Sequence, residues 1–182
     1  MELQRLTERH AAEVLRFERE NREWFTRSIS DRGDNYFTEF PARHAALLAE
    51  QATGLCHFHV AVDEEGAVIG RFNLVDAVDG AAELGFRVAQ RVAGRGVATA
   101  GVRRICDLAA GAYGLSRLIA DAARDNAGSL KVLRRTGFRP VGEVSLPGRP
   151  GIRHILELRP AAPGSPETNT PASLGRRSAE RQ

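Results

Sequence analysis

Residues 90–99 read QRVAGRGVAT, and they join an apolar stretch, ELGFRVA, to a helix-like segment, GVRRICDLAAGAYG. Gly94 and Gly96 stand in this turn, with Arg91 and Arg95 beside them. A helix N-terminus carries unpaired N–H groups and a partial positive charge, so it attracts anions, and glycines let a ligand come close to the backbone. The turn therefore predicts a phosphate-binding site, with a plain strand-to-helix turn as the alternative.

The spacing of these glycines differs from that of the common nucleotide-binding loops. The turn lacks the Lys-Ser/Thr pair of GxxxxGK[ST] and the third glycine of GxGxxG. A pyrophosphate ligand of another kind is therefore expected.

The overall composition is that of one soluble domain. Of the 182 residues, 42% are hydrophobic and 27% are charged, and no apolar run is long enough to cross a membrane. The N-terminal residues MELQRLTERHAAEV contain no apolar stretch of the kind found in secretory signals, so a cytoplasmic protein is expected. We expect one domain over residues 1–160 and a disordered tail over residues 161–182, which is rich in Pro, Ser and Thr.

Charge and ligand-type residues argue against two kinds of site. The formal net charge is only +3 and the basic residues are interspersed with acids, so direct nucleic-acid binding is not expected. Cys56 and Cys106 lie in apolar segments without metal-ligand spacing, which favours buried free thiols and no metal. His57 and His59 share one strand face with no third ligand, so a structural role is favoured.

Hydrophobic periodicity and turn residues predict a mixed α/β sheet with helices on both faces. After a candidate strand, ELQRL, two helices are expected in TERHAAEVLRFERENREWF and FPARHAALLAEQATG, with a break at RSISDRGDNYF between them. Three strands in an antiparallel meander should follow, LCHFHVAVD, AVIGRFNLVDAV and AELGFRVA. The remaining elements are the helix after the glycine turn, the strand SRLIADAA, the helix DNAGSLKVLRRTG, and the strands FRPVGEVSLP and GIRHILELRP around a PGRPG turn. Because a crossover helix joins AELGFRVA to SRLIADAA, these two strands should run parallel.

Two motifs in this order resemble the GNAT acetyltransferase superfamily, and specifically its RimJ/RimL-like branch, the ribosomal-protein-alanine N-acetyltransferase type. The family pattern [QR]xxGx[GA] is matched by Arg91, Gly94 and Gly96. The later pattern NxxSxxxLxxxGF is matched by Asn126, Ser129, Leu133, Gly137 and Phe138. The resemblance covers about residues 2–159. It implies a GNAT fold, in which a mostly antiparallel sheet contains one central parallel pair of strands.

The resemblance also implies acetyl-CoA as co-substrate, with no metal. The backbone amides of the turn would receive the pyrophosphate of coenzyme A, beside Arg91; these are the amides of Val92, Ala93, Gly94, Arg95, Gly96, Val97 and Ala98. The strand end from Phe86 to Ala89, including Val88, would pair with the pantetheine arm as an added strand. The family transfers acetyl by direct attack, so neither cysteine is needed as a nucleophile.

The same resemblance supplies candidates for the chemistry. Ser129 is the candidate acid for the leaving thiolate, because it follows Asn126 by three residues on one helix face and resembles the serine that RimL-type enzymes place near the coenzyme sulfur. The alternative is an ordinary serine in the first turn or on the surface of the helix. Many relatives use a late tyrosine as the acid, and none occurs between Asn126 and Phe138. Asn126 would bind pantetheine, cap its helix, or both. Glu83 is the candidate base, acting through a water molecule, and Asn73 would help to hold the amine or that water. For Glu83 and Asn73 the alternative is an ordinary polar surface residue.

The acceptor site is expected in the N-terminal half, in NREWFTRSISDRGDNYF. This segment combines the aromatic residues Trp24, Phe25, Tyr36 and Phe37 with Asp31 and Asp34, a mixture that suits a cationic amine or, alternatively, core and lid packing. The expected reaction is N-acetylation of a primary amine, with the N-terminal α-amine of a ribosomal-type protein preferred. The alternatives are a small amine (an aminoglycoside, a polyamine or an amino-acid derivative), or a non-catalytic coenzyme A or ribosome-binding module. A monomer or homodimer without a membrane partner is expected.

Overall fold

The structure is a computed structural model that describes residues 1–158, so the tail expected at 161–182 lies outside the described residues. Its elements in chain order are β1 (Glu2–Arg5), the short 3-10 helix η1 (Glu8–His10), α1 (Ala11–Glu20), α2 (Arg22–Thr26), α3 (Asp34–Thr38), α4 (Phe40–Ala52), β2 (His57–Val62), β3 (Val68–Val78), β4 (Ala81–Val88), η2 (Gln90–Val92), α5 (Val97–Gly111), β5 (Arg117–Ala123), α6 (Ala127–Arg135), β6 (Arg139–Leu146) and β7 (Arg149–Glu157).

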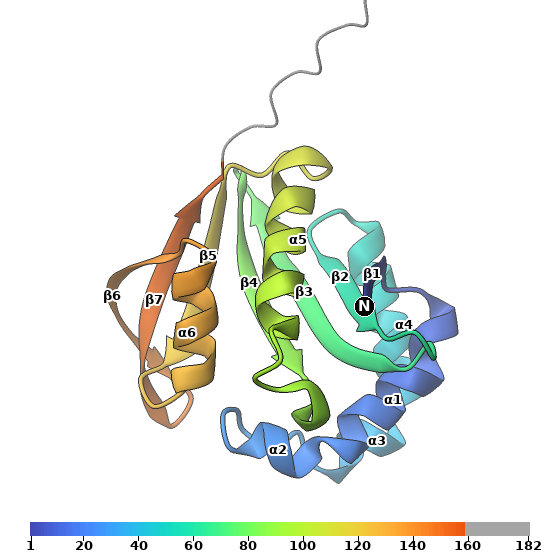
Figure 1. Cartoon of the computed structure of the whole chain (residues 1–182). Coiled ribbons are helices and arrows are strands. Elements are labelled where there is room, and N and C mark those ends of the chain that lie inside the picture. Colours follow the sequence, from blue (N-terminus) through green and yellow to red (C-terminus); the bar gives the residue numbers. More distant parts are fainter. Residues whose placement is uncertain (159–182) are drawn as a thin grey trace, which may run out of the picture.

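The strands form a seven-stranded sheet in the order β1-β2-β3-β4-β5-β7-β6 (Figure 1). Every neighbouring pair is antiparallel except β4 and β5, which α5 joins as a crossover. The mixed sheet with one central parallel pair is therefore confirmed, and so is the GNAT arrangement that the two motifs predict.

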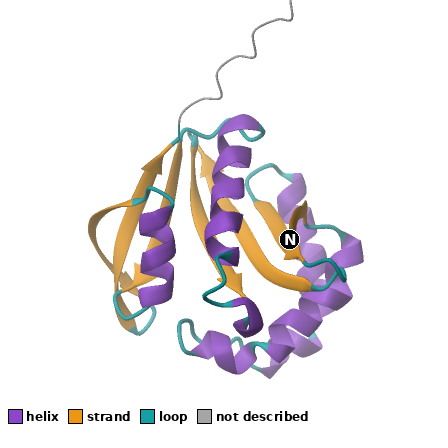
Figure 2. Ribbon diagram, in the orientation of Figure 1, coloured by secondary structure: helices purple, strands orange, loops and turns teal. Residues whose placement is uncertain are grey.

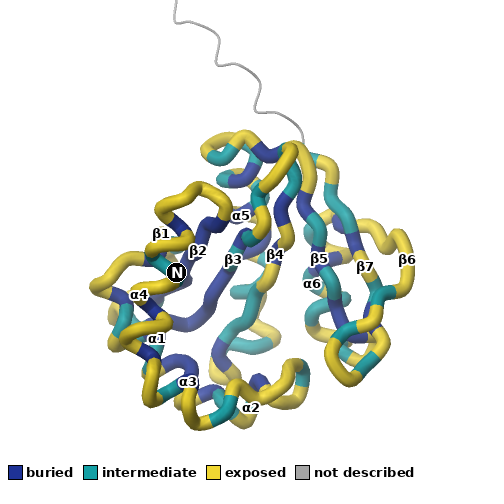
Figure 3. The backbone as a smooth tube through the Cα atoms, turned by 180° about the vertical axis from the view of Figure 1, so that it is seen from behind, coloured by how far each residue is buried: buried dark blue, intermediate teal, exposed yellow. Residues whose placement is uncertain are grey.

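Helices lie on both faces of the sheet, as expected. Figure 2 shows α5 and α6 in front of the strands, where they pack on β3, β4 and β5. On the opposite face α1 contacts β3 and α4 contacts β2. Seen from that side, the described helices leave β5, β7 and β6 uncovered, and most of β6 is exposed (Figure 3). One half of the rear face is consequently open to solvent.

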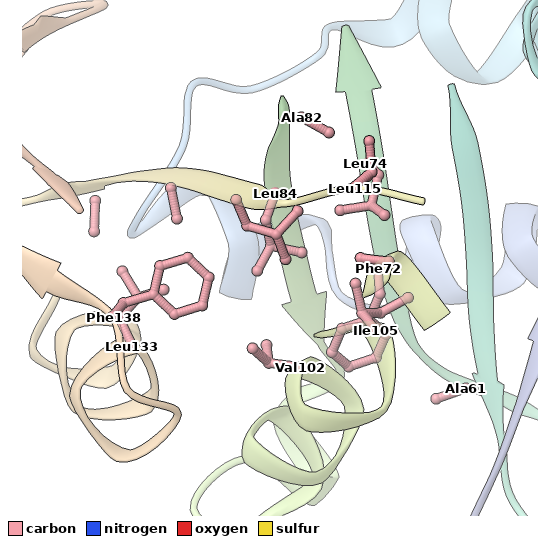
Figure 4. Close-up of a cluster of buried hydrophobic side chains, with 14 of the residues drawn as sticks. Ala61, Phe72, Leu74, Ala82, Leu84, Val102, Ile105, Leu115, Leu133 and Phe138 are labelled. Atoms are coloured by element: carbon pink, nitrogen blue, oxygen red, sulfur yellow. The ribbon is translucent and has the colours of Figure 1, made fainter. Parts of the chain in front are cut away.

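The larger core lies between the sheet and the front helices. Phe72, Leu74 and Leu84 of the strands pack against Val102 and Ile105 of α5 (Figure 4). α5 approaches the sheet closely because Gly101 has no side chain: a Cβ added there would lie 2.1 Å from the Phe72 ring. The glycine thus sets the distance between α5 and β3.

Gly101→Ala is expected to destabilise the protein by about 1–3 kcal/mol, because the methyl group has to displace a fully buried aromatic ring. Urea unfolding of the two proteins measures the difference. Gly111→Ala is the matched control, since its added Cβ meets nothing within 4 Å and alanine favours a helix. Equal losses in both variants would show that the contact with Phe72 does not limit the packing of α5.

Three local expectations were wrong. The single helix expected in TERHAAEVLRFERENREWF is divided into η1, α1 and α2, with a break at Asn21, whose side-chain amide donates to the Phe17 carbonyl. Residues 34–38, expected within a break, form the short helix α3, because Tyr36 is buried and its ring packs edge-on against Phe40. The turn between the last two strands is also shorter than PGRPG, since β7 already begins at Arg149. The sequence pattern missed α3 because Gly33, with φ 75°, starts the helix after a polar loop.

Candidate active site

The central feature of the site is the separation of β4 from β5. The two strands pair only between Ala81–Glu83 and Arg117–Ile119, although β4 continues to Val88 and β5 to Ala123. After Ile119, β5 is paired only with β7, on the side away from β4. The C-terminal half of β4 therefore has an edge that no strand of the described chain covers (Figure 1).

The backbone groups on this open edge can be assigned. The N–H of Ala89 donates to Ile69 in the β3 direction, and strand N–H and C=O groups alternate in side from residue to residue. The N–H and C=O groups of Phe86 and Val88 therefore point to the open edge. Trp24 donates its ring N–H to the Val88 carbonyl at 3.3 Å. Phe86 thus offers both its N–H and C=O to a ligand, and Val88 offers its N–H.

The glycine turn connects the C-terminal end of β4 to α5. Gly94 and Gly96 have φ values of 76° and 85°, a conformation that favours glycine, and Gly96 is the N-cap of α5. The amides of Val92, Ala93 and Arg95 donate to carbonyls within the turn. Those of Gly94, Gly96, Val97 and Ala98 have no such acceptor among the described residues.

These four amides stand at the positive end of a 15-residue helix, with open space over both glycines. The turn is therefore suited to an anion, as its sequence predicts. Of the two arginines, Arg91 forms an ion pair with Asp63 at 2.7 Å, whereas Arg95 is exposed.

The second motif lies beside the first. α5 and α6 begin at the same end of the parallel pair β4–β5, and the two helices contact each other. Asn126 caps α6, because its Oδ1 accepts a hydrogen bond of 3.0 Å from the Ser129 amide. Leu133 and Phe138 are core residues. Ser129 is half-buried in the first turn of α6, at the open end of the gap between the strands.

Glu83 and Asn73 lie on the rear face of the sheet, on neighbouring strands and two residues apart in register. Glu83 is exposed and stands opposite Val75 and Ile119, at the point where β4 and β5 separate. Asn73 stands opposite Gly85, and its Oδ1 is buried without a hydrogen-bond partner in the described chain. A Cβ added at Gly85 would meet nothing within 4 Å. An open space therefore lies over Gly85, next to the carboxylate of Glu83.

A buried charged cluster continues along the same face. Glu18 of α1 accepts hydrogen bonds from Arg71 at 2.7 Å and from Arg87 at 3.0 Å, and its side chain is only 2% exposed. Burial alone would raise the pKa of Glu18, but Arg87, Arg71 and Arg32 outweigh it and hold the pKa below its usual value. Burial lowers the pKa of Arg87 to about 10, so Arg87 stays charged at neutral pH.

The segment expected to bind the acceptor forms one wall of this region. A depression on the surface is lined by α1, α2, β4 and the loop after α2, including Glu18, Arg32 and Arg87. Asp31 and Asp34 both bind Arg22, at 2.5 and 2.6 Å, so one guanidinium offsets one of the two negative charges. Of the four aromatic residues, Phe25 and Tyr36 belong to the core, while Trp24 and Phe37 are partly buried against it.

The remaining candidates lie elsewhere. His59 bonds the Tyr113 hydroxyl at 2.8 Å and His57 stacks on the Tyr113 ring, at the end of α5 opposite the glycine turn. Burial lowers the pKa of His59 to about 4. Burial, followed by the charge of Asp107, raises the pKa of Cys106 to about 12, so this thiol is a poor nucleophile.

Residues 1–158 contain neither a metal-ligand cluster nor a membrane-spanning helix. No three His, Cys, Asp or Glu side chains in this part of the chain converge as metal ligands. No helix there is both long enough and apolar enough to span a bilayer.

Comparisons with known proteins agree with this geometry. The family model described as an acetyltransferase (GNAT) domain matches residues 1–139. A probable N-acetyltransferase, YjcK of Bacillus subtilis, is 28% identical over 138 residues, which cover 72% of this chain and 76% of YjcK.

Two solved structures show the same fold. The ribosomal-protein-S5-alanine acetyltransferase of Vibrio fischeri has a TM-score of 0.81 and 21% identity, covering 88% of this chain and 94% of that one. The spermidine N-acetyltransferase of Vibrio cholerae, in complex with CoA and spermine, has a TM-score of 0.70 and 17% identity, covering 86% and 95%.

The chain belongs to the GNAT acetyltransferase family. It is an acetyl-CoA-dependent N-acetyltransferase, and its relatives by structure include enzymes of the RimJ/RimL type.

Proposed function

We propose that this enzyme acetylates the N-terminal α-amine of a protein, by direct attack on acetyl-CoA in a ternary complex. The observation that carries the proposal is that the rear face of the sheet is exposed to solvent at the point where β4 and β5 separate. Glu83 and Gly85 are exposed on the rear face, and no described helix covers the strands beyond them. A chain end can reach such a site without being enclosed. A ribosomal acceptor would place the reaction in the cytoplasm.

In this proposal the coenzyme fills the gap between the two strands. The pyrophosphate binds the free amides of the glycine turn, with Arg95 near, and the pantetheine arm bonds Phe86 and Val88 on the open edge of β4. The thioester then lies close to Glu83 and within reach of the first turn of α6.

The proton transfers follow from the same arrangement. The ammonium of the acceptor loses its proton to Glu83 through a water molecule, which the buried Oδ1 of Asn73 helps to orient. The free amine attacks the thioester carbon, and the carbon–sulfur bond then breaks. Ser129 donates its hydroxyl proton to the departing sulfur and recovers a proton from the nitrogen of the new amide, so the coenzyme leaves as a thiol. Asn126 positions Ser129 by capping α6.

The test is an acetyl-CoA consumption assay, read as free thiol, on a panel of N-terminal peptides and small amines. Turnover of peptides is the expected result. Turnover confined to small amines would replace the proposal by the second candidate, which the structural likeness to a spermidine acetyltransferase supports. Tight coenzyme binding without turnover of any acceptor would favour a non-catalytic binding module.

Gly96→Glu is expected to abolish coenzyme A binding in calorimetry. The substitution strains a backbone with φ 85° and brings a negative charge to the proposed anion site. Gly114→Glu is the matched control: it has a comparable φ of 65°, with open space around it, but lies beyond the other end of α5. Unchanged affinity in Gly96→Glu would remove the pyrophosphate from this turn.

Ser129→Ala is expected to lower kcat about tenfold while leaving coenzyme affinity unaltered; the effect is modest because a thiolate is already a fair leaving group. Steady-state turnover assays measure kcat, and calorimetry measures the coenzyme affinity. Ser145→Ala, at an exposed position of β6, should change neither. A normal kcat in Ser129→Ala would exclude this hydroxyl from the mechanism.

A further inference from the structure

The acceptor side of the site contains more positive than negative charge. Among the residues that line the depression and their ion-pair partners, four guanidinium groups stand against three carboxylates. The arginines are Arg22, Arg32, Arg71 and Arg87, and the acids are Glu18, Asp31 and Asp34. The two aspartates share Arg22, which offsets only one of them, so the positive excess lies on the inner cluster of Glu18, Arg71, Arg87 and Arg32. In this cluster the single carboxylate of Glu18 is bonded to two arginines. Arg32 is close enough to lower the pKa of Glu18 as well.

The inner cluster is not fully satisfied by the protein itself. Arg71 is 4% exposed, and its Nε has no hydrogen-bond partner among the described residues. Arg87 stays 20% exposed and lines the depression. A buried guanidinium that lacks a full set of partners carries an electrostatic cost, which an additional anion would relieve.

The cluster and the proposed base share one strand face. Glu83, Gly85 and Arg87 are alternate residues of β4, and side chains of alternate residues point the same way. Gly85, with open space over its Cα, stands between Glu83 and Arg87 along this strand. An acceptor seated there would have its amine beside Glu83 and its next few atoms beside Arg87.

We infer that the acceptor carries a carboxylate close to the reacting amine, and that Arg87, supported by Arg71, binds this carboxylate. This inference rests on the proposed function and narrows it to protein N-termini with an acidic residue at one of the first positions after the amine. A polyamine, which presents further positive charge where Arg87 lies, is disfavoured.

The experiment compares kcat/KM for three peptides that differ only at the second residue, Ser-Asp, Ser-Asn and Ser-Lys, at saturating acetyl-CoA with the full chain. The expected ratio of Asp to Asn is about tenfold or more, typical of one charge-assisted pair, with Lys below Asn. In Arg87→Gln the ratio should fall to about one through a higher KM for Ser-Asp, and Arg87→Lys should restore part of it. Arg16→Gln, an exposed position on α1, should keep the full ratio.

The results with peptides and with free small acceptors distinguish a failure of this inference from a failure of the proposed function. Equal rates for the three peptides, or a preference for Ser-Lys, would overturn the inference and leave N-terminal acetylation intact. If no peptide reacts, aspartate, asparagine and spermidine are compared as free acceptors. Preference for aspartate that is lost in Arg87→Gln would support the inference and reject the protein acceptor. Preference for spermidine, or no turnover at all, would overturn both. The wild-type ratios decide the matter even where a thermal melt shows that Arg87→Gln does not fold.

Discussion

Glu18→Gln is expected to lower the free energy of unfolding by about 3–5 kcal/mol, the usual effect of removing one partner from a buried ion pair. The amide keeps the shape of the side chain but leaves Arg71 and Arg87 without a counter-charge in a site that is almost closed to water. Urea unfolding at neutral pH measures the loss. Because the helix and the two strands meet at this carboxylate, the loss is expected in the whole domain rather than at one end of it.

A matched control and the pH dependence sharpen this prediction. Glu13→Gln removes an exposed ion pair of the same helix and should cost less than about 1 kcal/mol. The pKa of Glu18 is lower in the folded than in the unfolded protein, so its stabilisation is complete above the unfolded pKa and is lost as the pH falls through the folded value. Glu18→Gln should therefore lose less stability between pH 6 and pH 3 than the wild type. Equal acid sensitivity would contradict the assignment.

Glu83→Gln is expected to lower kcat by about 10²- to 10⁴-fold, the range associated with a general base. The amide cannot accept the proton that the acceptor must lose before its nitrogen attacks. Coenzyme affinity should not change, because Glu83 lies on the rear face and the coenzyme in the gap between strands. Part of the rate should return at high pH, where the acceptor amine loses its proton to solvent. Stopped assays between pH 6 and 10 measure both effects.

The control for this variant is Glu157→Gln, which removes another exposed carboxylate of the sheet, the partner of Arg117. Its kcat should stay within about twofold of the wild type, as for a surface ion pair. A fall of less than twofold in Glu83→Gln would assign proton removal to another group.

The sequence predicted the local conformation of the glycine turn and of the Asn126 cap, but not the charged cluster. The glycine turn and the Asn126 cap depend on local backbone conformation, and residues a few positions apart determine it. Positive φ at Gly94 and Gly96 and the hydrogen bond from Ser129 to Asn126 are interactions of this kind. The order of strands and helices followed from periodicity for the same reason.

The charged cluster could not be found in this way. Glu18 bonds to partners 53 and 69 residues away. The signal that the sequence offers is weak: Arg71 and Arg87 stand in two strands made mostly of apolar residues. Their pairing across β3 and β4 depends on register, which only the folded sheet defines. The ion pairs of Asp31 and Asp34 with Arg22 were missed for a similar reason, since they join residues 9 and 12 positions apart.

The uncovered edge of β4 also affects the stability and the amount of folded protein in the cell. If the coenzyme supplies the missing partner along Phe86 and Val88, it completes the sheet, and a bound ligand at a hundred times its Kd adds about 2.7 kcal/mol of stability. Without it, an exposed strand edge invites pairing with other chains. The steady amount of folded enzyme would then follow the supply of coenzyme, so that the catalyst is preserved when its acetyl donor is plentiful and cleared when it is scarce.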